Sequence, residues 1–179
     1  MILPLDRKIA LAVHKGDVQF LRENMPSKME PTQQLFAIVL GYSNLETFLF
    51  FVDELKFDYT KTPYSMLFRA CGNLKKNFQI AEYILKNNME PLTPKSLEDC
   101  LYNASLRENI ELMQILISYG AVPTVEIGCN AVKFGNGEML KLLVNNGLDI
   151  NKNNPTNAPP FSVTRMAEYL SVNIHNLLN

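Results

Sequence analysis

The sequence predicts an all-α protein in which pairs of helices are repeated along the chain as a helical solenoid. Three recurring markers predict this fold: a polar residue that starts a helix, a small residue shortly before it, and a glycine or asparagine that ends the helix. The markers recur at intervals of roughly 30 residues. A fixed interval of this size is typical of repeat proteins, in which each repeat is one small unit of secondary structure.

The first marker is an Asn or Asp that is followed, two positions later, by Glu or Gln. The five copies are separated by 27, 33, 32 and 27 residues and start at Asp17, Asn44, Asn77, Asn109 and Asn136. Asn and Asp side chains accept hydrogen bonds from free amides in the first turn of a helix. An acidic residue in that turn interacts favourably with the helix dipole. Each copy therefore predicts the start of the second helix of a pair.

The second marker is an alanine five to seven positions before each helix start, where a small side chain allows helices to pack closely. It occurs at Ala12, Ala37, Ala70, Ala104 and Ala131. The third marker follows the second helices, at Asn88, Gly120 and Gly147. Asn and Gly tolerate the left-handed backbone conformation that closes a helix. These positions therefore predict helix ends.

Two segments resemble the second half of an ankyrin repeat. They are NIELMQILISYGA at residues 109–121 and NGEMLKLLVNNGLDIN at residues 136–151, and residues 77–91 resemble it less closely. The chain departs from the family at the Thr-Pro-Leu-His signature, of which only Thr62-Pro63 and Thr93-Pro94 remain. The resemblance implies one ankyrin-like domain over residues 1–179, with repeats at approximately 5–30, 31–60, 61–92, 93–124 and 125–153.

The C-terminal segment departs from the repeat pattern. Residues 151–160 are rich in Asn and Pro and predict a loop, and residues 162–178 carry apolar residues at helical spacing. A stack of repeats needs an atypical terminal unit to cover its core. We therefore expect residues 160–179 to form a C-terminal helical cap. The alternative is a detachable helix that binds a partner.

Composition favours a soluble protein of the cell interior. Lysine and arginine number 17 against 18 acidic residues, and this balance argues against a nucleic-acid-binding repeat. Apolar stretches such as Phe48–Val52 are far too short to span a membrane. The three cysteines form no CxxC pair, so a disulfide framework is not expected. We expect a cytoplasmic location, which is the host cytoplasm if the protein is an effector.

No group of residues predicts catalysis, a cofactor or a metal site. His14 and His175 lie at opposite ends of the chain, and no phosphate-binding, zinc-protease or serine-hydrolase motif occurs. Cys71, Cys100 and Cys129 are 29 residues apart, so a repeat structure places them on separate rungs that one ion cannot join. The cysteines are expected to be small residues of the first helices, and the protein is not expected to be an enzyme.

We expect the function to be non-catalytic protein–protein interaction on a concave face formed by the first helices. The protein would be an adaptor, an inhibitor or an anchoring subunit, as a monomer or in a hetero-complex. A viral or bacterial effector that acts on host proteins fits the divergent repeats. A structural subunit of a large assembly is the alternative. The candidate binding residues flank the alanine markers at Lys15, Tyr42, Arg69, Asn103, Arg107, Asn130 and Phe134.

Overall fold

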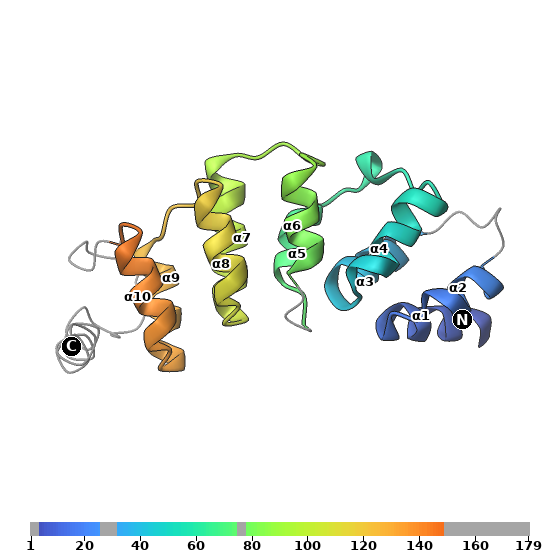
Figure 1. Cartoon of the computed structure of the whole chain (residues 1–179), viewed down its shortest axis with the longest axis horizontal. Helices are drawn as coiled ribbons and strands as arrows, with labels where there is room; N and C mark the ends of the chain where they lie inside the picture. The colour runs from blue at the N-terminus through green and yellow to red at the C-terminus, as the bar shows by residue number, and fades with distance from the viewer. Residues whose placement is uncertain (1–3, 26–31, 75–77, 149–179) are drawn as a thin grey trace. The chain divides into compact units, whose positions relative to one another are not determined.

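The computed structural model of the chain describes residues 4–25, 32–74 and 78–148 (Figure 1). All regular elements in these residues are helical, which confirms the prediction of an all-α protein. In chain order they are α1 (Pro4–Lys15), α2 (Val18–Asn24), α3 (Gln33–Tyr42), α4 (Leu45–Leu49), the π-helical segment η1 (Phe50–Glu54), the 3-10 turn η2 (Tyr59–Lys61), α5 (Met66–Cys71), α6 (Gln79–Lys86), α7 (Pro94–Leu106), α8 (Ile110–Ser118), α9 (Val125–Phe134) and α10 (Gly137–Asn145). The expected C-terminal cap at 160–179 and the loop before it lie outside the described residues.

The chain forms two compact units, unit 1 at Met1–Pro91 and unit 2 at Leu92–Asn179. In unit 1, α3 packs between α1 and α5, α2 packs on α1, and α6 packs on α4 and α5. The aromatic core of unit 1 is centred on Phe36, whose ring centroid lies 5.9 Å from Phe48 and 4.3 Å from Phe57. On the surface, Arg22 of α2 forms an ion pair with Glu54 of η1 at 2.7 Å. This pair lowers the pKa of Glu54 below its usual value, mainly through the hydrogen bond from Arg22.

Unit 2 repeats the same local arrangement with four helices. The first helices α7 and α9 pack against each other, the second helices α8 and α10 do so as well, and each second helix packs on its own first helix. Ala104 and Ala131, the small residues of the two first helices, are fully buried. In unit 1, Ala12 and Ala70 are also buried, while Ala37 is half-buried. Four of the five alanine markers therefore lie in the core, as their role in close packing requires.

The predicted helix starts are confirmed at four positions. In each, a side-chain oxygen accepts from the backbone amide three residues further on, at 3.0 Å for Asp17, 2.9 Å for Asn44, 3.1 Å for Asn109 and 2.9 Å for Asn136. The fifth position, Asn77, lies outside the described residues. Helix α6 begins at Gln79, and the residue before it, Phe78, makes no side-chain capping hydrogen bond.

The predicted helix ends are confirmed as well. Asn88, Gly120 and Gly147 have positive φ angles of 48°, 96° and 96°. The amide of the next residue then donates to a carbonyl five residues back in the helix. These bonds join Met89 to Ile84 at 3.1 Å, Ala121 to Leu116 at 3.0 Å and Leu148 to Leu143 at 3.0 Å. This is the Schellman arrangement, which satisfies carbonyls that would otherwise lack a partner at the helix end.

Three of the turns between paired helices, α1–α2, α7–α8 and α9–α10, use the same device. Gly16, Glu108 and Gly135 have positive φ angles of 76°, 51° and 65°. The amide of the following cap residue donates to the alanine marker five positions earlier, and the bonds join Asp17 to Ala12 at 2.9 Å, Asn109 to Ala104 at 3.1 Å and Asn136 to Ala131 at 2.9 Å. One residue thus closes the first helix with its amide and starts the second with its side chain. This double role explains the five-residue spacing of the two markers in these three helix pairs.

Substitutions at two left-handed positions should change stability in opposite directions. Gly147→Ala adds a Cβ that meets no atom within 4 Å, so the variant measures backbone strain alone. It should lower the free energy of unfolding by about 1–2 kcal/mol. Lys56 is exposed and already has a φ of 53°. Lys56→Gly should raise the free energy of unfolding by about 0.5–1 kcal/mol, because relief of strain exceeds the added chain entropy.

Urea unfolding followed by circular dichroism measures both changes. If the two variants shift the free energy of unfolding in the same direction, the left-handed assignment at one of these positions is wrong.

Candidate protein-interaction surface

Helix α1 has one exposed stripe opposite its buried face. The stripe residues occupy positions i, i+1, i+4, i+7 and i+8, which share one side of a helix, and they are Arg7, Lys8, Leu11, His14 and Lys15. Leu11, at the centre of the stripe, is 53% exposed although it is apolar. The opposite side of α1 is buried through Ile9, Ala12 and Val13, so Leu11 lies outside the core.

Tyr42 extends this surface from α1 onto α3. It is the last residue of α3, and its side chain is 37% exposed. Its ring centroid lies 5.7 Å from that of His14. The contact joins the end of α3 to the stripe of α1. Of the residues predicted from sequence, Lys15 and Tyr42 are thus exposed and lie on neighbouring helices.

Helix α5 contributes Phe68 and Arg69. Phe68 is 43% exposed, and the Arg69 guanidinium carbon lies 4.3 Å from the centroid of the Tyr64 ring. Burial raises the pKa of Tyr64, whereas the charge of Arg69 acts in the opposite direction. The protonated Tyr64 hydroxyl donates to the carbonyl of Gln33 at the start of α3, at 2.8 Å. Arg69 therefore rests on an aromatic ring that is itself fixed to α3.

We define the first-helix surface of unit 1 as the exposed stripe of α1 together with Tyr42 of α3 and the exposed pair Phe68 and Arg69 of α5. Its residues are Arg7, Lys8, Leu11, His14, Lys15, Tyr42, Phe68 and Arg69. The sequence predicted Lys15, Tyr42 and Arg69 among them. It did not predict Leu11 or Phe68, because the register that leaves these apolar residues exposed depends on which side of each helix is buried.

In unit 2 the predicted residues lie near the ends of α7 and α9. Asn103 and Arg107 are half-buried, and Phe134 is exposed. The Lys133 ammonium lies 5.7 Å from the centroid of the Phe134 ring. The Nε atom of Arg107 is shielded from solvent and has no hydrogen-bond acceptor among the described residues. These residues therefore combine aromatic and cationic groups, as Phe68 and Arg69 do in unit 1.

Asn130 lies in the interior, whereas its position beside Ala131 predicted an exposed residue. It is only 8% exposed, and its Nδ2 donates to Ser105 Oγ at 2.9 Å. Ser105 Oγ in turn donates to the Tyr102 carbonyl at 2.6 Å. Because this network holds α9 against α7 in the interior, Asn130 has a structural role. We therefore remove it from the candidate binding residues.

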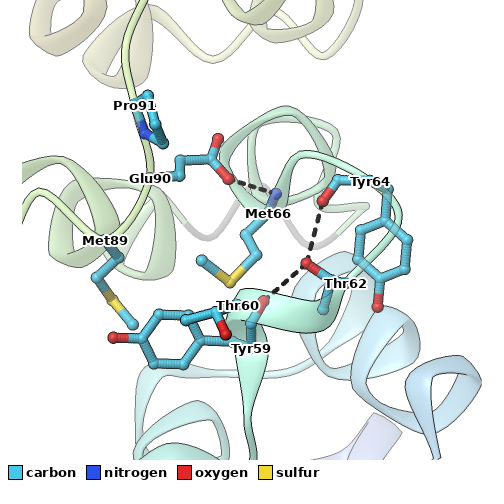
Figure 2. Close-up of a pocket in the computed structure, with 8 residues that line it drawn as sticks. All are labelled: Tyr59, Thr60, Thr62, Tyr64, Met66, Met89, Glu90 and Pro91. Carbon is cyan, nitrogen blue, oxygen red and sulfur yellow. Dashed lines mark hydrogen bonds between the residues drawn. The ribbon is translucent and has the colours of Figure 1, made fainter.

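A pocket of about 310 Å³ lies beside the start of α5 (Figure 2). It is lined by Tyr59, Thr60, Thr62, Tyr64, Met66, Met89, Glu90 and Pro91. The Glu90 carboxylate accepts from the Met66 amide at 2.8 Å, the Ser65 hydroxyl at 2.6 Å and the Leu67 amide at 3.2 Å. The carboxylate thus satisfies free amides at the positive end of α5. Its contacts assign Glu90 a structural role, which the sequence did not reveal.

The cysteines lie in first helices, as predicted. Cys71 in α5 and Cys100 in α7 are buried, Cys129 in α9 is half-buried, and none of these three described cysteines is in a disulfide. Burial and the nearby Glu126 carboxylate raise the pKa of Cys129, which keeps its thiol protonated. Among the residues that the structure describes, no three His, Cys, Asp or Glu side chains are grouped as a metal ion would require. None of the described helices has the length and apolar character needed to span a bilayer.

Comparison of the chain with protein-family models finds no match, and comparison with curated protein sequences finds none either. The ankyrin resemblance therefore rests on the sequence markers.

Removing the Glu90 carboxylate should destabilise unit 1. Glu90→Ala leaves the Met66 and Leu67 amides and the Ser65 hydroxyl without their acceptor. The free energy of unfolding should fall by about 1–3 kcal/mol. Glu90→Gln retains one acceptor oxygen and should lose less than Glu90→Ala. Urea unfolding at neutral pH measures both, and an unchanged midpoint for Glu90→Ala would show that these bonds contribute nothing.

Proposed function

We propose that the protein is a non-catalytic protein–protein interaction module that binds a partner protein on the exposed side of its first helices. One observation carries the proposal: Leu11, Tyr42 and Phe68 are large, apolar or aromatic, and exposed on three first helices of unit 1. Aromatic and arginine side chains contribute most of the binding energy at many interfaces, and large exposed apolar patches with a polar rim mark interaction sites.

The architecture that we propose is an ankyrin-like stack of helix pairs. Three features support it: the common period of the markers, the left-handed turn that three of the helix pairs share, and the packing of first helix on first helix within each unit. In such stacks each pair contacts only its neighbours, and one layer of helices remains available for a partner. The proposed role is that of an adaptor, an inhibitor or an anchoring subunit.

The proposal predicts that a partner depends on Tyr42 and Phe68. The full chain, carrying an affinity tag, is used to isolate partners that mass spectrometry then identifies. The Tyr42→Ala, Phe68→Ala double variant should bind the isolated partner at least about tenfold more weakly, because truncation of a central aromatic residue commonly costs more than 1–2 kcal/mol.

The matched control is the Tyr119→Ala, Val144→Ala double variant. Tyr119 and Val144 are 38% exposed each, close to the 37% of Tyr42 and the 43% of Phe68, and they lie at the end of α8 and in α10. The control should bind like the unmodified chain, and both double variants should keep its melting temperature. Equal loss of binding in the two double variants, or the absence of any partner that discriminates between them, contradicts the proposed surface.

A further inference from the structure

Charge is unevenly divided between the two helix layers of unit 1. The first helices α1, α3 and α5 contain four cationic residues, Arg7, Lys8, Lys15 and Arg69, and a single acidic one, Asp6. The second helices α2, α4 with η1, and α6 contain two cationic residues, Arg22 and Lys86, and five acidic ones, Glu23, Glu46, Asp53, Glu54 and Glu82. The net charge of −1 for the whole chain does not show this separation.

The two layers also differ in how their cations are paired. Arg22 pairs with Glu54 at 2.7 Å, and Lys86 pairs with Glu82 at 2.7 Å. The four first-helix cations form no ion pair with any residue that the structure describes. The positive charge of the first helices is therefore not neutralised within the described fold.

Arg69 illustrates how this surface can receive a carboxylate. Its guanidinium lies over the Tyr64 ring, 4.3 Å from the ring centroid. A stacked guanidinium keeps its N–H donors at the edge of its plane, where they match the geometry of a carboxylate. The stacking also holds the guanidinium in place, so less side-chain freedom is lost on binding.

We infer that the first-helix surface of unit 1 binds an acidic peptide segment in which apolar side chains lie between the carboxylates. This inference rests on the function proposed above and specifies its partner. The cations supply the charge complementarity, and Leu11, Tyr42 and Phe68 supply apolar contacts between them. Charges arranged in this way raise the association rate and exclude basic partners, while the apolar contacts provide the affinity.

The charge separation favours a peptide over an extended polyanion. The carboxylates of α2, α4, η1 and α6 lie in the same unit, and at 0.1 M salt charges act over a Debye length of about 10 Å. A nucleic acid or an anionic bilayer extends past the first-helix surface and meets this repulsion. A short acidic segment contacts only the basic layer.

The experiment uses the full chain and a fluorescein-labelled peptide of about twelve residues, in which pairs of glutamates alternate with leucine or phenylalanine. Fluorescence anisotropy should show binding that weakens as salt is raised from 50 to 500 mM. The Lys8→Glu, Lys15→Glu variant should bind about tenfold or more weakly and should lose most of the salt dependence. The control is Lys133→Glu, Lys141→Glu, which reverses two exposed lysines of unit 2 and should leave binding unchanged.

Several results would overturn the inference. They are no binding of the acidic peptide, equal binding of a peptide with glutamine at every glutamate, equal weakening by the control variant, or tighter binding of oligothymidine or phosphatidylserine vesicles than of the peptide. The last result would identify a polyanion site. A partner that requires Tyr42 and Phe68 but binds the Lys8→Glu, Lys15→Glu variant normally would overturn this inference and leave the proposed function standing.

Discussion

Short helices impose one constraint on the whole structure: the backbone groups at their ends need partners. Each helix leaves about four amides and four carbonyls without an intrahelical bond, and the described α-helices are only 5 to 13 residues long. A left-handed residue followed by Asp or Asn meets this need at both neighbouring ends. At Asp17, Asn109 and Asn136 the amide closes one helix and the side chain starts the next. The turn is therefore short, and the second helix folds back onto the first.

Packing between pairs adds a second set of polar connections. Asn73 donates to the carbonyls of Leu40 and Ser43 at 3.1 and 3.2 Å, and Asn130 donates to Ser105 at 2.9 Å. The bonds of Asn73 join the segment after α5 to the end of α3, and the bond of Asn130 joins α9 to α7. Because a buried donor without a partner is costly, these bonds favour one alignment of the helices. In unit 1 this alignment of α3 and α5 fixes which side of each helix stays exposed, and hence where Tyr42 and Phe68 lie.

Features with a local cause could be predicted from the sequence. The caps at Asp17 and Asn109 and the left-handed ends at Gly120 and Gly147 depend on residues within one or two turns, so their residue types indicate them directly. Glu108 and Lys56 also adopt positive φ, at 51° and 53°, and were not predicted because neither residue type favours that conformation.

Features that depend on distant contacts could not be predicted in this way. Asn130 was expected at the surface, but its partner Ser105 is 25 residues away in the sequence. The Glu90 carboxylate bonds to residues 23 to 25 positions earlier. The separation of charge in unit 1 likewise requires knowing which helices share a layer. The total charge of the chain therefore argued against a nucleic-acid ligand, but it could not indicate the acidic peptide that we propose as the partner.

Left-handed turns close the first helix and start the second in three helix pairs. Amide hydrogen exchange of the full chain, followed by NMR, tests this arrangement at Asp17, Asn109 and Asn136. These residues precede a helix, where an amide without an acceptor exchanges freely with solvent. The hydrogen bonds to Ala12, Ala104 and Ala131 predict that all three amides exchange slowly, like amides inside the adjoining helices. Exchange at the rate of an unstructured peptide at these positions would contradict the account.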